Sequence, residues 1–145
     1  MPVKARVSEL PKFSSSKPIS SRFMKQLASK VQREIRIRTL KGEGVIGPED
    51  NLQERRHKKP YSERYKKHRR KHGRNVSRVD HVYSGRMLNS MRTSASNLRA
   101  TITVSASQME KAYFTNKLRP WFYMSKKQQI KAGDALAKEI ARFYK

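Results

Sequence analysis

The most chemically distinctive part of this sequence is a basic stretch between Arg55 and Arg78, where 12 of 24 residues are Lys or Arg. Tyr61 and Tyr65 are interleaved with these cations. Clustered basic side chains with aromatic residues between them neutralise phosphate backbones and release counterions. The same pattern also suits a solvated surface or one that faces acidic protein neighbours, and charge alone does not separate these interpretations.

Eleven cations of this stretch are therefore candidates for contacts with DNA phosphates or with protein neighbours in an assembly. They are Arg55, Arg56, Lys58, Lys59, Arg64, Lys66, Lys67, Arg69, Arg70, Lys71 and Arg74.

Other constellations that do chemistry are incomplete. The glycines at 42, 44 and 47 are not followed by the Lys-Ser/Thr pair of a phosphate-binding loop, so we interpret them as a flexible loop. His68 and His72 lie four residues apart, but zinc needs further ligands and the neighbouring cations repel a metal ion. His57 and His81 lie too far apart in sequence to be assigned to a site. We predict no metal and no cofactor.

Catalytic groups also fail to converge in the sequence. The 11 Asp and Glu residues are scattered, and the Gly-x-Ser-x-Gly setting of a nucleophilic serine does not occur. Because the chain has no cysteine, thiolate chemistry, disulfides and cysteine-based zinc sites are excluded. We predict that the protein is not an enzyme.

The charge balance points to an anionic partner. The chain has 145 residues, enough for one core, and a formal net charge of +24 that repels itself in isolation. Residues 1–18 contain three prolines and the run Ser14 to Ser16, which predicts an extended basic arm. No apolar run is long enough for a signal peptide or a membrane span, so we expect assembly in the cytoplasm without a membrane.

Apolar spacing predicts one helix, and start and stop signals predict a second, in the first half of the remaining chain. Phe23, Leu27, Val31 and Ile35 recur every four residues and predict a helix over residues 20–38. Residues 39–59 are rich in glycine and are expected to form a loop, and a short basic helix then runs from about residue 60 to Gly73. We expect one domain over residues 19–145 with a basic insertion at about 55–78.

The second half predicts the sheet and the closing helix. Ser84 is expected to cap a short helix that turns Met87, Leu88 and Met91 inward. Alternating apolar residues predict a strand over residues 98–106, paired with residues 92–95, and residues 119–124 are expected to add an edge strand. Ser125 to Gln128 form a capping-box pattern that opens a helix over 125–144, with Ile130, Leu136, Ala137, Ile140 and Phe143 or Tyr144 on its apolar face.

These elements predict an α+β fold, in which a small antiparallel sheet is packed by an N-terminal and a C-terminal helix and carries a basic extended N-terminal arm.

Three segments, taken in order, resemble the tail-completion, or virion-morphogenesis, family of neck proteins of long-tailed phages. The first is the basic helix that begins at Tyr61 and ends near Gly73. The second is the segment Ser84 to Met91, in which a hydroxyl residue, Gly and Arg precede an apolar pair and a serine. The third runs from the aromatic pair Tyr113-Phe114 to the Arg119-Pro120-Trp121 motif before the last helix.

The resemblance implies a structural virion protein at the head–tail junction, not an enzyme. Such a subunit forms or joins a ring that completes the tail, meets tube, terminator and connector proteins and lines part of the DNA channel. Five residues are expected to act as structural anchors of the fold, namely Ser84, Gly85, Arg86, Pro120 and Trp121. The alternative is a sequence-nonspecific nucleic-acid-binding protein, ribosome-associated or involved in DNA packaging.

Overall fold

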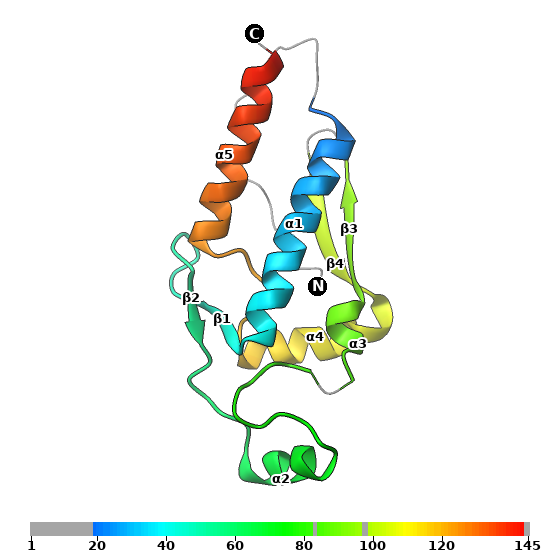
Figure 1. Ribbon diagram of the computed structural model, residues 1–145, viewed down its shortest axis with the longest axis vertical. Helices are drawn as coiled ribbons and strands as arrows, with labels where there is room; N and C mark the ends of the chain where they lie inside the picture. Colours follow the sequence, from blue (N-terminus) through cyan, green and yellow to red (C-terminus); the bar gives the residue numbers. More distant parts are fainter. Residues whose placement is uncertain (1–18, 83, 97–98, 144–145) are drawn as a thin grey trace.

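The computed structural model describes residues 19–82, 84–96 and 99–143, and the predicted arm over residues 1–18 lies outside the described residues. The fold is α+β, as the sequence predicts, with long helices near both ends of the described chain and two separate antiparallel hairpins. Figure 1 shows α1 (Ser21–Leu40) and α5 (Lys126–Phe143) side by side along the long axis. None of the helices in this part of the chain is long and apolar enough to cross a membrane.

Helix α1 is the central element of the core. Ser20 caps it by accepting a hydrogen bond from the backbone N–H of Phe23 at 3.1 Å, which confirms the predicted start. Its buried residues Ala28, Val31 and Ile35 pack against the hairpin of β3 (Met91–Ala95) and β4 (Ala100–Val104). The pairing of these two strands was predicted correctly.

Helix α5 packs on another part of α1 through a stripe spaced by four residues. Gln128, Ala132 and Leu136 are buried, and Ile140 is half-buried. Leu136 meets Met24 of α1. The predicted face was partly wrong, because Ile130 is 54% exposed and Ala137 is exposed too. The stripe that packs is therefore the one through Gln128, Ala132 and Leu136. The side chains of Phe143 and Tyr144, which were also predicted for this face, lie outside the described residues.

The predicted capping box at the start of α5 is confirmed by two reciprocal hydrogen bonds. The backbone N–H of Gln128 donates to the Ser125 hydroxyl at 3.2 Å. In return, the backbone N–H of Ser125 donates to the Gln128 side-chain oxygen at 2.9 Å.

Two segments in which we predicted no helix or strand form regular elements. Residues 39–59 contain a hairpin of β1 (Glu43–Ile46) and β2 (Gln53–Arg56), and Gly42 and Gly47 take positive φ at the two ends of β1. The glycines therefore bound a strand where we expected a loop. The stretch after β4 forms α4 (Ala106–Leu118), which gave no helical signal because its large apolar residues do not share a buried face.

The predicted edge strand over residues 119–124 is wrong. These residues form an irregular turn, although the backbone N–H of Val45 in β1 donates to the Pro120 carbonyl at 2.9 Å. The short helix α3 (Arg86–Asn89) is capped by Gly85 in the left-handed region, at φ 75°, and not by Ser84 as predicted. A backbone turn at glycine, which L side chains rarely adopt, opens this helix without a side-chain cap.

The contact between β1 and the turn at Pro120 gives a testable prediction. A Cβ placed on Gly44 would lie 2.1 Å from the Pro120 carbonyl oxygen and 2.4 Å from a ring carbon of His57. We therefore expect Gly44→Ala to lower the free energy of unfolding by about 2 kcal/mol or more, measured by urea denaturation.

The matched control is Gly133→Ala in α5, where a Cβ would meet no atom within 4 Å. This variant should gain about 0.5–1 kcal/mol, because alanine loses less backbone entropy than glycine on forming a helix. Equal stability of the two variants would contradict the close packing inferred at Gly44.

Candidate functional site: a basic lobe held by a buried arginine

The basic stretch forms a separate lobe at one end of the molecule. We define the basic lobe as residues 57–82, which contain α2 (Glu63–Lys71) and the segment that returns from it to α3. Figure 1 shows α2 beyond the rest of the fold, at the end of the long axis opposite the C-terminus. Ser62 caps α2 and Gly73, with φ 63°, follows it, in agreement with the predicted helix.

Arg69 lies inside the lobe and holds it together. Its side chain is 1% exposed, and it donates to the Asp80 carboxylate at 3.0 Å and to the Asn75 carbonyl at 2.7 Å. The guanidinium also lies over the Tyr61 ring, 4.6 Å from its centre. Arg69 was predicted to contact phosphate or a neighbouring subunit, but these contacts occupy it within the lobe.

Tyr61 completes this polar centre as a hydrogen-bonding group. Its hydroxyl donates to Asp80 at 3.3 Å and accepts from the backbone N–H of His81 at 3.2 Å. Burial raises the pKa of Tyr61 to about 12, so the hydroxyl stays neutral and keeps its donor. The Tyr65 ring of α2 lies edge-on to the Tyr61 ring, with 5.1 Å between their centres, and Tyr61 itself lies just before the helix.

The lobe is joined to the rest of the fold by Arg119. Its guanidinium donates to the carbonyls of Lys59 and Pro60, both at 3.0 Å, and lies 5.5 Å from the centre of the Tyr61 ring. Arg119 precedes Pro120 and Trp121, and the Trp121 side chain is fully buried in the main core. One short segment thus contacts both the lobe and the core.

His57 and His81 form a pair that the sequence did not reveal. Their Nε2 atoms are 3.2 Å apart, a distance that fits one ring N–H donating to a bare nitrogen on the other ring. The residues lie 24 positions apart, so only the fold brings them together. The described residues contain no group of three or more metal-ligating side chains, and this pair is therefore better explained as a hydrogen bond than as half of a metal site.

Burial keeps both histidines neutral. It lowers the pKa of His57 to about 4, with repulsion from Arg119 and Arg38 added, and the pKa of His81 to about 3. The nearby His57 and the positive charges of Arg119 and Arg69 also oppose protonation of His81. The hydrogen bond between His57 and His81, which lie near the two ends of the lobe segment, therefore forms while both rings are uncharged.

The structure places the remaining ten candidate cations on the outside. Arg55 and Arg56 lie on the exposed strand β2, and Lys58 and Lys59 lie in the exposed first residues of the lobe. On α2 the side chains of Arg64, Lys67, Arg70 and Lys71 are exposed, Lys66 is half-buried, and Arg74 is exposed beyond the helix. Lys66 is paired with Glu63 at 2.6 Å, so the lobe offers cations mainly from the outer face of α2.

The five expected anchor residues have different environments. Trp121 is fully buried and donates its ring N–H to the Thr115 hydroxyl at 3.3 Å, and Pro120 is half-buried beside β1. Gly85 provides the left-handed turn before α3. Ser84 and Arg86 have exposed side chains, so burial does not support the anchoring role that was predicted for them.

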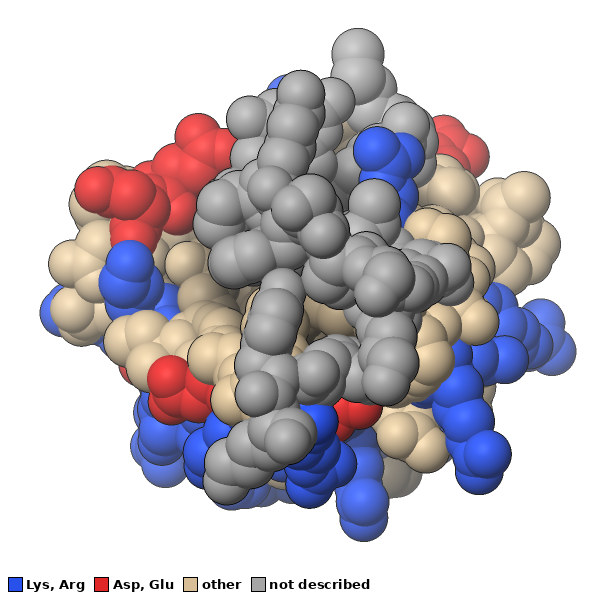
Figure 2. All heavy atoms as spheres, turned by 90° about the horizontal axis from the view of Figure 1, so that it is seen from above, with Lys and Arg blue, Asp and Glu red and all other residues tan. Residues whose placement is uncertain are grey.

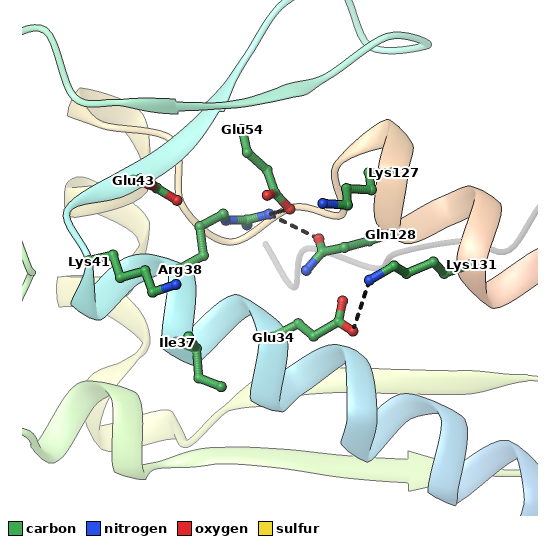
Figure 3. A pocket seen from close by; sticks show the side chains of 9 residues that line it. All are labelled: Glu34, Ile37, Arg38, Lys41, Glu43, Glu54, Lys127, Gln128 and Lys131. Atoms are coloured by element: carbon green, nitrogen blue, oxygen red, sulfur yellow. Dashed lines mark hydrogen bonds and ion pairs between the residues drawn. The ribbon is translucent and has the colours of Figure 1, made fainter.

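A second polar cluster lies where α1, the β1–β2 hairpin and α5 meet, around a cleft of about 200 Å³ (Figure 3). Arg38 is 4% exposed there, and it donates to the carbonyls of Trp121 and Tyr123, both at 2.8 Å, and to the Gln128 side chain at 2.9 Å. Glu54 lies 3.6 Å away as its counter-ion. Because Arg38 is committed to these groups, the cluster is better explained as a structural junction than as a ligand site.

The buried ion pair of the lobe can be tested by removing its charge. Asp80→Asn keeps the shape of the side chain but leaves the buried Arg69 without a counter-ion, so we expect a loss of about 3 kcal/mol in the free energy of unfolding. Amide hydrogen exchange should show that α2 loses protection. Glu63→Gln, at an exposed pair, is the control and should leave both quantities unchanged, and an equal effect of the two substitutions would argue against a lobe held from inside.

The histidine pair predicts a loss of stability on acidification. Folded His57 and His81 have lowered pKa values, so between about pH 6.5 and pH 4 the unfolded chain binds protons that the folded chain does not. Stability should therefore be full above pH 6.5 and fall as the pH falls. Urea denaturation, followed by the fluorescence of the single tryptophan, measures this slope.

His57→Gln should flatten the pH dependence between pH 6.5 and pH 5, because it removes one of the two titrating groups. The control Gln26→Ala, which removes no titrating group from an exposed position of α1, should keep the wild-type slope. An unchanged slope in His57→Gln would show that other groups cause the acid sensitivity.

Comparison of the chain with protein-family models, curated proteins and solved structures found no match.

Proposed function

We propose that this protein is a structural subunit of a tailed-phage particle, a tail-completion or neck protein that terminates the tail, helps to join it to the head and forms part of the DNA channel. The observation that carries the proposal is that the three segments with the family resemblance meet at one place. The Arg119 guanidinium lies 5.5 Å from the centre of the Tyr61 ring, at the start of the first segment, and donates to the carbonyls of Lys59 and Pro60 just before it. Thr115 contacts Met87 of the second segment, at 3.6 Å from its sulfur, and the ring N–H of Trp121.

This convergence supports the proposal because the resemblance was based on order and spacing in sequence. Segments that merely happened to look familiar would have no reason to pack together. Here they form one connected unit from the basic lobe, through Arg119 and Trp121, to α3. A shared unit of this kind is what a family with a common scaffold would retain, whereas surfaces would vary with partners.

The exposed apolar surface of α4 supports a role in assembly. Tyr113, Phe114 and Leu118 are 50%, 54% and 67% exposed, although they are among the largest apolar residues of the chain. The Tyr113 and Phe114 rings contact each other edge-on at 5.5 Å. Neighbouring exposed apolar side chains rimmed by polar residues mark contact surfaces, and in a ring this surface would face an adjacent protein.

The alternative function is sequence-nonspecific nucleic-acid binding by a free protein. The exposed cations on α2 favour it, because contacts with phosphate carry affinity without base readout. The two functions differ in their partners. A neck subunit assembles with protein after its nucleic acid is removed, whereas a free binder then has no partner.

The first test is native mass spectrometry or mass photometry of nuclease-treated protein, alone and mixed with purified tail tubes. We expect closed rings, or protein bound at one end of the tube. Monomers that ignore tubes but bind duplex DNA with a steep salt dependence would contradict the neck proposal and favour the alternative.

The α4 surface gives a matched pair of variants for the same measurement. Phe114→Ser with Leu118→Ser should lower the fraction of rings or of tube-bound protein at least about tenfold, because truncating central apolar contacts of an interface typically costs more than 1 kcal/mol each. Ile130→Ser, which removes an equally exposed apolar side chain from α5, should leave assembly unchanged. Equal assembly of all three proteins would exclude α4 as the contact surface.

A further inference from the structure

Helix α2 separates its side chains into an inner and an outer face. Tyr65 and Arg69 turn inward, toward Tyr61 and Asp80, at positions separated by four residues. The opposite face of the same helix carries Arg64, Lys67, Arg70 and Lys71, and all four are exposed. At 3.6 residues per turn these four positions fall within about 120° of one another around the helix axis.

We infer that this outer face of α2, formed by Arg64, Lys67, Arg70 and Lys71, is a binding surface for the phosphate backbone of nucleic acid. The inference deepens the proposed function, on which it rests for its setting in a DNA channel. It narrows the eleven candidate cations to four on one rigid element.

The dimensions of this face fit a row of phosphates. Residues 64 and 71 are separated by roughly 10 Å along the helix, at 1.5 Å per residue. One strand of a duplex carries a phosphate about every 3.4 Å along its axis, so the row spans about three phosphates. The charge is complementary and the helix presents no apolar pocket there, which suits contacts with backbone phosphates and not with base edges.

The inner contacts make the surface rigid before it binds. Within the lobe, α2 is held by the Arg69–Asp80 ion pair and by the Tyr61 hydroxyl, which donates to Asp80. Arg119 joins the lobe to the rest of the fold by donating to the carbonyls of Lys59 and Pro60. A fixed row of cations loses less conformational entropy on binding than a flexible basic tail does. The aromatic residues of the stretch contribute mainly to this support, since Tyr61 is buried and Tyr65 is only 38% exposed.

An acidic protein surface is the competing partner, and net charge alone would attract either one. Exposed basic side chains also lie on other elements, such as Arg22 and Lys25 on α1. Figure 2, a view from the end opposite the lobe, shows Lys and Arg along its lower and right edges. A test must therefore separate the position of the four charges on α2 from their number.

The experiment compares two variants of the full chain that lose the same four charges. One is Arg64→Gln, Lys67→Gln, Arg70→Gln and Lys71→Gln on α2. The control is Arg22→Gln, Lys25→Gln, Lys30→Gln and Arg33→Gln, which neutralises four exposed cations on α1. Fluorescence anisotropy measures binding of nuclease-treated protein to two labelled duplexes of unrelated sequence, each of about 30 base pairs, between about 50 and 200 mM salt.

The wild type should bind both duplexes with equal affinity. The α2 variant should bind at least about tenfold more weakly, with a salt slope smaller by about three to four, whereas the α1 variant should stay within about threefold of the wild type. Equal losses in the two variants, or no loss in the α2 variant, would overturn the inference. It would also be overturned if polyglutamate of matched charge displaced the duplex as well as unlabelled duplex does, because an acidic protein would then be the better partner.

Three further measurements keep the outcomes distinct. The melting of each variant, followed through the fluorescence of the buried Trp121, shows whether the fold is intact. A variant with Arg64→Lys and Arg70→Lys, which keeps Lys67 and Lys71, should bind DNA like the wild type if positive charge on this face is what matters. Ring formation or tube capture by the α2 variant tests the proposed function separately. Normal assembly with lost DNA binding is the expected result, whereas failed assembly of the wild type with intact α2-dependent DNA binding would remove only the neck proposal.

Discussion

The fold depends on one buried arginine at the end of α1. Arg38 is nearly inaccessible to water, yet it donates to the carbonyls of Trp121 and Tyr123 and to the side chain of Gln128. Glu54 neutralises its charge from the neighbouring strand β2. Although burial lowers the pKa of Arg38, the guanidinium keeps its charge because an arginine does not lose its proton in proteins.

A planar group with five donors is well suited to this junction. The turn at residues 119–125 has no strand partner that would satisfy its carbonyls along its whole length, and unpaired buried carbonyls are costly. Arg38 satisfies two of them and at the same time fixes the capping residue Gln128 of α5. A lysine, with a point charge on a flexible chain, would not reproduce this geometry. The irregular turn is thus possible because a helix supplies its hydrogen bonds.

The basic lobe repeats the same solution on a smaller scale. Arg69 lies among Asp80, Asn75 and two tyrosines, and it replaces the apolar core that so polar a segment cannot form. Arg119 then joins the lobe to the turn that Arg38 holds. The protein therefore uses the buried side chains of Arg38 and Arg69 as structural centres. The cations on the outer face of α2, by contrast, are exposed to solvent.

The sequence alone determined the elements whose signals are local. The four-residue apolar spacing over α1, the box at Ser125 to Gln128 and the alternation over β4 predicted helices and a hairpin correctly, because each depends on residues a few positions apart. The β1–β2 hairpin and the His57–His81 pair were missed because they depend on distant contacts, such as that of Val45 with Pro120. Helix α4 was missed because its large apolar residues do not share a buried face. Likewise, the 35 basic residues look alike in sequence, and the large positive charge was evident from composition. Only the tertiary structure decided that Arg38 and Arg69 are interior, because burial depends on carbonyl and carboxylate partners brought together by folding.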